Sequence, residues 1–285
     1  MNGPRDLPVA NGDGPRDLPG AGMDGLRVIE SGTGPAVLWV HGYTMDSTLW
    51  EPLWNLLPGW RHLGVDLPGH GGSEPLRPGL TLPELALRLA AFAEAEGAHR
   101  VVGLSFGSSV TLQMALEAPE VVHNLVLAAP TLGGAPPDPA ARRRYMELMT
   151  LRRARGAPEQ MAELWMDSPP DIFRGTEAHP ELRARLREVI GRHSWAELDT
   201  GAMAMIGMHR HPPEDLARVR ARTMVIVGDS DMPVFTANAE TLRRNVPGCE
   251  VRVIPGTAHL PLLERPEIAS DAVFKGLSLP EKVGK

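Results

Sequence analysis

Apolar residues recur along the chain with two different periods, and from residue 26 onward the two periods alternate. Short β-branched or apolar runs predict strands at 26–30, 35–41, 61–66, 99–104, 123–129, 222–228 and 249–254. Helical spacing predicts helices at 47–56, 81–96, 105–118, 235–246 and 266–275. Strands that alternate with helices are typical of βαβ units, so the sequence predicts an α/β fold with a doubly wound, mostly parallel sheet.

The alternation breaks between residues 131 and 218, where the sequence offers no convincing strand. Helical patterns lie near 138–154, 157–167, 181–192 and 195–207, separated by proline-rich joints. A stretch of this length is too long for a loop inside a domain. We therefore expect a helical lid subdomain at 131–218, inserted into an α/β core that comprises residues 23–130 and 219–278.

Residues 1–22 differ from the rest of the chain in composition. The hexapeptide Gly-Pro-Arg-Asp-Leu-Pro stands at 3–8 and again at 14–19. Two copies are too few and too short for a repeat architecture. A segment rich in Pro, Gly, Asn and Asp buries little apolar area, so we expect a flexible tail, whose role the sequence does not indicate.

Charge and cysteine content exclude several classes of protein. The chain has 29 Lys and Arg against 35 Asp and Glu, a net charge of −6, which argues against a nucleic-acid or anionic-membrane binder. The single cysteine, Cys249, excludes an internal disulfide framework and cysteine-rich zinc sites. No apolar run approaches the roughly 18 residues of a membrane span, and a secretory signal pattern is missing. We expect a cytoplasmic protein with a small-molecule substrate; its oligomeric state is not readable from the sequence.

The strongest chemical signal is the segment Gly103-Leu104-Ser105-Phe106-Gly107, which follows a predicted strand and opens a predicted helix. A sharp strand-to-helix turn exposes the serine hydroxyl, and the glycines leave room for the neighbouring strand and helix. The helix N-terminus adds partial positive charge where an oxyanion would develop. This context predicts that Ser105 is a nucleophile.

A serine nucleophile needs a base and an acid behind the base. The best base is His259, in the loop after the strand at 249–254, and two acids, Asp229 and Asp231, follow the strand at 222–228. We prefer Asp231, because it lies further into the loop, and interpret Asp229 as a turn acid. The pair His209 and His211 could bind a metal, but a solvated helix end is the favoured interpretation.

Together these motifs resemble the α/β-hydrolase superfamily, in particular its capped, lipase- or esterase-like serine hydrolases. The chain order Ser105, Asp231, His259 is the order that this family uses. His41-Gly42 after the second strand and the run Asp66-Leu67-Pro68-Gly69-His70-Gly71 after the third also match. The resemblance covers about residues 24–278 and implies the α/β-hydrolase fold.

The sequence departs from some branches of this superfamily. Leu104 replaces the asparagine that is common in the carbon–carbon bond hydrolases, and Ser105 stands where epoxide hydrolases and haloalkane dehalogenases have aspartate. Ser108 replaces a second glycine after the turn, which adds a hydroxyl at the helix start.

The resemblance also implies roles for other residues. The backbone N–H groups of Tyr43 and Phe106 would form the oxyanion hole, while His41 would brace its loop and His70 would have no chemical role. An apolar pocket is expected between the lid and the sheet, with Trp165 and Trp195 on the lid side. Six residues near the motif loops are expected to line it: His41, Trp50, Trp54, Met232, Val234 and Leu260.

The sequence therefore predicts a serine hydrolase that cleaves a carboxylic ester, lactone or thioester of a small, largely apolar substrate through an acyl-enzyme, without cofactor or metal. One alternative is a proline-iminopeptidase-like aminopeptidase, which needs lid carboxylates for a substrate ammonium group; the candidates are Glu147, Glu159, Glu163, Asp167 and Asp171. Others are a cofactor-free perhydrolase and a biosynthetic thioesterase-cyclase. An alternative of another class is a non-catalytic ligand-binding protein on the same scaffold.

Overall fold

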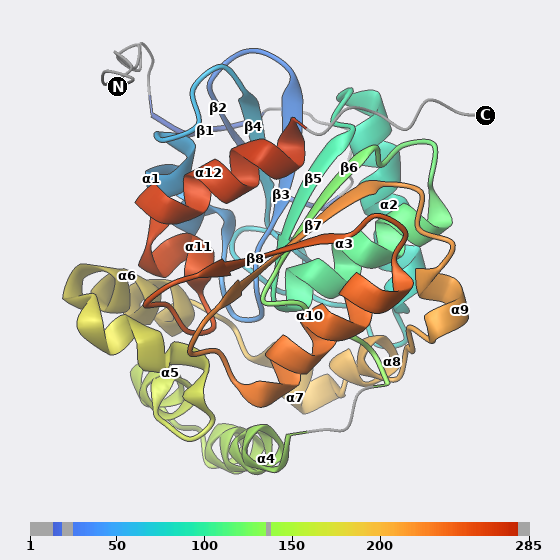
Figure 1. Cartoon of the computed structure of the whole chain (residues 1–285). Helices are drawn as coiled ribbons and strands as arrows, with labels where there is room; N and C mark the ends of the chain where they lie inside the picture. The colour runs from blue at the N-terminus through green and yellow to red at the C-terminus, as the bar shows by residue number, and fades with distance from the viewer. Residues whose placement is uncertain (1–13, 19–24, 135–137, 279–285) are drawn as a thin grey trace.

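The computed structural model describes residues 14–18, 25–134 and 138–278, and an eight-stranded sheet lies at its centre (Figure 1). The strand order is β1-β2-β4-β3-β5-β6-β7-β8; β1/β2 and β2/β4 pair antiparallel and the other neighbours pair parallel. The strands are β1 (Arg16–Asp17), β2 (Val28–Ser31), β3 (Ala36–Val40), β4 (Arg61–Val65), β5 (Arg100–Leu104), β6 (Asn124–Ala128), β7 (Arg222–Gly228) and β8 (Glu250–Ile254). The predicted α/β fold with a mostly parallel sheet is confirmed.

Helices cover both faces of the sheet, and this arrangement follows from the sequence of the strands. In β3, Leu38 and Val40 enter one hydrophobic core, whereas Val37 and Trp39 enter the other, because successive strand residues point to opposite faces. Helices α2, α3 and α10 pack on the first face, and α1, α11 and α12 on the second. Their bounds, with a preceding 3-10 turn, are η1 (Ser47–Trp50), α1 (Glu51–Trp54), α2 (Leu82–Ala95), α3 (Phe106–Glu117), α10 (Pro233–Asn245), α11 (Pro261–Glu264) and α12 (Pro266–Leu277).

The N-terminal segment departs from the predicted flexible tail where the structure describes it. Arg16 and Asp17 form β1, which pairs antiparallel with β2. Ion pairs stabilise the pairing: Arg16 binds Glu30 at 2.9 Å and Asp17 binds Arg27 at 2.7 Å. The second copy of the hexapeptide thus contributes the edge strand of the sheet, while the rest of residues 1–22, apart from 14–18, lies outside the described residues.

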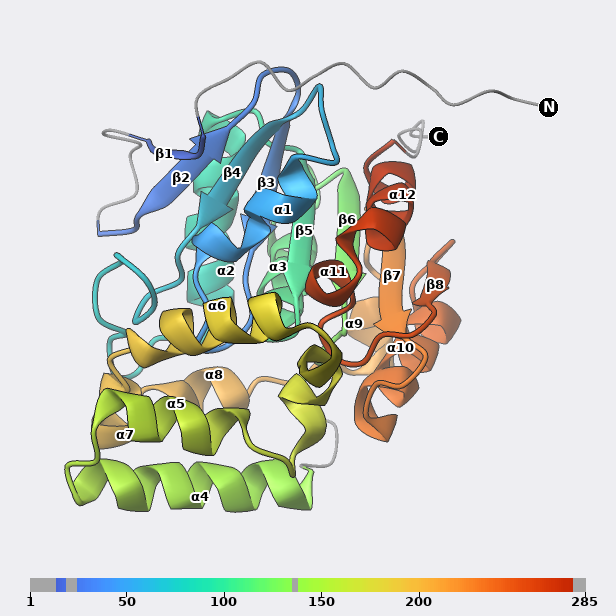
Figure 2. The same cartoon turned by 90° about the vertical axis from the view of Figure 1, so that its left-hand side faces the viewer.

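Residues 138–218, which we name the helical cap, lie beyond one end of the sheet, where Figure 2 shows α6, α5 and α4 stacked in that order away from the strands. The described part of 131–218 contains no strand. The helices are α4 (Pro139–Arg153), α5 (Pro158–Met166), η2 (Asp171–Ala178), α6 (Pro180–Gly191), α7 (Ala196–Thr200), α8 (Met203–Gly207) and α9 (Pro213–Leu216). The helix predicted at 195–207 is two helices, because Gly201 ends α7 in the left-handed region.

Among the described residues, the structure contains no helix that is both long and apolar enough to cross a membrane.

The two chain segments that connect the cap to the core are paired with each other through His211. The backbone N–H of His211 donates to the Gly133 carbonyl at 2.9 Å, and the Gly133 N–H donates to His211 Nδ1 at 3.1 Å. His211 Nε2 then donates to Gln113 Oε1 of α3 at 3.1 Å. The interpretation of His209 and His211 as a solvated helix end is wrong for His211, which is buried.

We expect the stability of this junction to depend on pH. Burial, and next His209, lower the pKa of His211 from 6.5 to about 4. Between these two pKa values His211 binds a proton in the unfolded chain but not in the folded chain. The contribution of neutral His211 to the free energy of unfolding is therefore complete above pH 6.5 and is lost as the pH falls from 6.5 through 4, by roughly 1.4 kcal/mol per pH unit at most. Urea unfolding of His211→Gln should show a shallower loss from pH 7 to pH 5 than the wild type, with His179→Gln of the cap as the control. An unchanged pH dependence in His211→Gln would contradict this account.

Candidate active site

Ser105 lies at the sharp turn between β5 and α3, in a strained backbone conformation. Its φ is 52° and its ψ is −118°, values that a residue with a side chain rarely adopts. The turn is fixed by two backbone hydrogen bonds, from Ser105 N to the Ala128 carbonyl at 2.8 Å and from Ser108 N to the Ser105 carbonyl at 2.9 Å. The predicted strand-to-helix turn is therefore present, and Ser105 itself remains partly exposed.

The glycines around Ser105 are required by close backbone packing. A side chain at Gly107 would collide with the carbonyl oxygens of Val40 and His41, and one at Gly103 would collide with Thr111 and the Gly107 carbonyl. Ser108 adds two bonds of its own, because its hydroxyl donates to the Ser105 carbonyl at 2.5 Å and accepts from Thr131 N at 2.9 Å. The turn is thus tied to the end of β3 and to the segment that leaves β6.

The structure brings Ser105, His259 and Asp231 together as the sequence predicts. The Ser105 hydroxyl donates to His259 Nε2 at 2.9 Å, and His259 Nδ1 donates to Asp231 Oδ1 at 3.1 Å. A carboxylate only accepts, so this contact assigns the imidazole proton to Nδ1 and leaves Nε2 free to take the serine proton. Met232 N also donates to Asp231 Oδ1, at 2.7 Å. Asp229 lies outside the cluster and accepts from Gly256 N at 3.0 Å, the turn role expected for it.

Two residues that sequence analysis missed hold the imidazole of His259 in place. The Phe235 ring lies against it, with ring centroids 4.0 Å apart. The buried Glu264 carboxylate accepts from the backbone on both sides of the histidine, from Ala258 N at 2.7 Å and from Leu260 N at 2.9 Å. A side chain at Gly175 of the cap would collide with this carboxylate, so the cap backbone lies directly on it. The only signal in the sequence that could have pointed to Glu264 is its position five residues after His259.

The segment after β3 lies beside Ser105 and carries Tyr43, one of the two predicted oxyanion donors. A Cβ at Gly42 would be 3.5 Å from the Ser105 Cβ, so Tyr43 begins next to the nucleophile. The other predicted donor, Phe106, is the first residue of α3, where backbone N–H groups have no acceptor within the helix. His41 braces this segment as expected, because its Nδ1 contacts the Gly42 carbonyl at 2.8 Å and its Nε2 accepts from Leu67 N at 3.0 Å.

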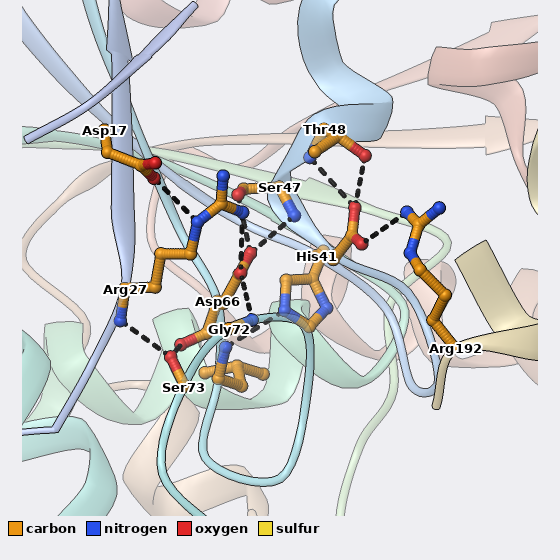
Figure 3. A network of polar contacts seen from close by, with 11 residues as sticks. Asp17, Arg27, His41, Ser47, Thr48, Asp66, Gly72, Ser73 and Arg192 are labelled. Atoms are coloured by element: carbon orange, nitrogen blue, oxygen red, sulfur yellow. Dashed lines mark hydrogen bonds and ion pairs between the residues drawn. The ribbon is translucent and has the colours of Figure 1, made fainter. Parts of the chain in front are cut away.

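Asp66 holds the segment after β3 in place through a network of hydrogen bonds, which Figure 3 shows in close-up. Its carboxylate accepts from Ser47 N at 2.8 Å, from Gly72 N at 2.9 Å and from Arg27 at 3.2 Å. Burial opposes ionisation, but the neighbouring His41 and the bonds from Ser47 and Gly72 outweigh it and lower the pKa of Asp66. Asp66 is therefore ionised at neutral pH and fixes the turn on which the His41 ring rests.

The residues expected to line a pocket fall into two groups. For Trp50 and Trp54 the expectation is wrong, because their rings pack in the core: Trp50 lies 5.3 Å from Trp39, and Trp54 stacks on His62 at 5.3 Å. Leu260 is also fully buried in this core. His41 is buried and binds the backbone of Leu67. Met232 and Val234 are partly exposed and border separate cavities of about 620 and 670 Å³.

Comparison with known proteins identifies the group to which this arrangement is similar. A sequence model of the alpha/beta hydrolase family matches residues 37–272, most of the chain. The solved structure of a thermophilic esterase from Thermogutta terrifontis, with malate bound, superposes with a TM-score of 0.71 at 27% identity and covers 88% of this chain and 92% of that one.

Two curated relatives are similar in sequence. One is a pimeloyl-(acyl-carrier protein) methyl ester esterase from Nitrosomonas europaea, 29% identical over 255 residues, which are 83% of this chain and 93% of the relative. The other is the dihydrolipoyllysine-residue acetyltransferase component of an acetoin cleaving system from Cupriavidus necator, 29% identical over 249 residues. That match covers 83% of this chain but 62% of the relative, so the chain spans less than two thirds of its length.

Glu264→Ala should destabilise the fold, because it leaves the buried N–H groups of Ala258 and Leu260 without an acceptor. Each such group costs about 1–3 kcal/mol, so we expect a loss of about 3 kcal/mol in the free energy of unfolding by guanidinium chloride. Glu267→Ala, which removes an exposed ion pair with Arg265, should cost less than about 1 kcal/mol. Equal losses in the two variants would show that the Glu264 contacts do not hold the loop.

Proposed function

This chain belongs to the alpha/beta hydrolase family. We propose that it is an esterase that cleaves a carboxylic ester of a small, largely apolar substrate, with Ser105 as nucleophile. The observation that carries the proposal is the continuous path of hydrogen bonds from Ser105 through His259 to the buried Asp231. The similar proteins from Nitrosomonas europaea and Thermogutta terrifontis are both esterases, which supports the same reaction class. A lactone or thioester carbonyl would react in the same way.

The reaction proceeds in two acyl transfers. His259 Nε2 takes the proton of Ser105 while the serine oxygen bonds to the ester carbonyl carbon, and the leaving alcohol receives that proton as the carbon–oxygen bond breaks. Water then attacks the acyl-enzyme, again with His259 as base, and releases the acid and the free serine. Asp231 keeps the imidazole in the required tautomer and stabilises its protonated form.

The carbonyl oxygen becomes negatively charged in each transfer and rests on the N–H groups of Tyr43 and Phe106. Each donor of this kind contributes about 3 kcal/mol to stabilisation of the transition state. The N-terminus of α3 adds to the favourable potential, because its aligned peptide dipoles place partial positive charge beside the oxyanion.

The aminopeptidase alternative has less support. Four of the five cap carboxylates named for it, those at 147, 159, 163 and 167, are exposed, and Asp171 forms a surface ion pair with Arg174 at 3.1 Å. These carboxylates face solvent, where an ion pair with a substrate ammonium group contributes little to binding. A comparison of aryl esters with aminoacyl anilides separates the two functions.

Ser105→Ala should abolish hydrolysis of p-nitrophenyl butyrate, with a loss in kcat of about 10⁴-fold or more. It should also prevent covalent labelling by a fluorophosphonate. Ser109→Ala, a serine in the first turn of the same helix, should retain both. Undiminished turnover in Ser105→Ala would remove this residue from the mechanism, and tight ligand binding without labelling of the wild type would favour a non-catalytic binding protein.

Asp231→Asn should lower kcat by about 10³- to 10⁴-fold, because an amide favours the wrong imidazole tautomer. Asp229→Asn makes the same chemical change two residues earlier, at a group that contacts only the neighbouring turn, and should leave kcat within about threefold. Steady-state kinetics on the same aryl ester measure both variants. A larger loss in Asp229→Asn than in Asp231→Asn would reverse the assignment of the acid.

A further inference from the structure

Two consecutive residues beside the nucleophile, Tyr43 and Thr44, are bound by the helical cap. The Tyr43 hydroxyl donates to Glu197 Oε1 of α7 at 2.6 Å. Trp165 Nε1 of α5 donates to Thr44 Oγ1 at 2.8 Å. These contacts join residues 154 and 121 positions apart in the chain, so they form only when the cap is seated on the core.

The Glu197 carboxylate is itself held in place. His193 Nε2 donates to the same oxygen, Oε1, at 3.0 Å, and both side chains are 2% exposed. The rings of His193, Trp195 and Trp165 surround Tyr43, with centroids 5.8, 6.4 and 5.7 Å from its own. The Tyr43 ring is therefore enclosed by cap residues on α5, on α7 and in the segment before α7, together with His70 of the core, whose ring centroid is 5.8 Å away.

The protonation states make this bond a strong one. Burial, and next the Glu197 charge, raise the pKa of Tyr43 well above 10, so its hydroxyl keeps its proton. Burial opposes ionisation of Glu197, but the bonds from His193 and Tyr43 outweigh it and lower the pKa of Glu197. A neutral hydroxyl thus donates to a buried carboxylate, the charge-assisted type of hydrogen bond that is roughly twice as strong as a neutral one.

The backbone at this point needs external support. Thr44 has a φ of 64°, in the left-handed region that β-branched residues avoid. Such a conformation persists only where surrounding contacts impose it. The Thr44 hydroxyl donates to the Tyr43 carbonyl at 2.6 Å while it accepts from Trp165, so the cap stabilises the peptide unit that follows the proposed oxyanion donor.

We propose that the cap residues Glu197 and Trp165 are positioning residues for the reaction: through Tyr43 and Thr44 they hold the Tyr43 N–H where the oxyanion forms. The cap then completes the oxyanion hole as well as covering the site. This inference rests on the proposed function, because it assigns the Tyr43 N–H to a developing oxyanion.

Tyr43→Phe tests the proposal with the least disturbance, since it removes one hydroxyl and keeps the ring and the backbone N–H. We expect kcat for p-nitrophenyl butyrate to fall about tenfold, a fraction of the effect of losing an oxyanion donor, with KM within about twofold. Inhibition by an alkyl trifluoromethyl ketone, whose hemiketal oxygen occupies the oxyanion position, should weaken by about the same factor. Thr200→Val, which removes another hydroxyl of α7 that bonds only to the backbone of Ala196 and Ala202, should change neither value.

Variants of Glu197 complete the test. Glu197→Ala should match Tyr43→Phe, and the double variant should be no worse than either single one, because the two residues act as a unit. Glu197→Gln, whose amide oxygen can still accept from Tyr43, should recover most of kcat. A kcat and ketone affinity within twofold of the wild type in Tyr43→Phe would overturn the proposal, as would an equal loss in Thr200→Val. Full activity in Ser105→Ala would instead overturn the proposed function, and this inference with it.

Discussion

Backbone contact between the turn after β5 and the end of β3 is the constraint on which the rest of the site depends. At Gly107 the chain passes so close to the carbonyls of Val40 and His41 that no side chain fits. This approach fixes Ser105 in its strained conformation and places the segment 41–44 beside it. A side chain at position 107 would push the turn away from β3, and the Ser105 hydroxyl would then move away from both His259 and Tyr43. The close packing at Gly107 therefore fixes the position of Ser105 relative to both residues.

The parallel sheet extends this local constraint to residues far apart in sequence. Strands β3, β5, β7 and β8 end at the same edge, and each delivers one part of the site in the loop that follows. The loops are held by backbone hydrogen bonds to buried carboxylates, Asp66 on one side and Glu264 on the other. These two groups take no part in bond making but fix the loops, because the oxygens of one carboxyl group can accept from several N–H groups at once.

Sequence reasoning succeeded where the signal is local and failed where it depends on tertiary contact. Ser105 was predictable because its glycines and flanking elements are adjacent in the chain. Trp50 and Trp54 lie near a motif in sequence, but the direction of their side chains was not readable, and they fill the core. Glu197 and His193 carry no motif, since their partner Tyr43 is about 150 residues away. His211 has the polarity of a solvated helix end, yet pairing of the two connecting segments buries it.

The contact between Gly175 and Glu264 links the packing of the cap to the position of the base, His259. With the cap seated, its backbone keeps water from the carboxylate that clamps the loop of His259. The same carboxyl group accepts from the N–H groups on both sides of His259, so one buried side chain contacts the cap backbone and the loop of the base at once. A substitution in the cap at residue 175 would therefore reach the imidazole through Glu264, although it changes no residue of the core.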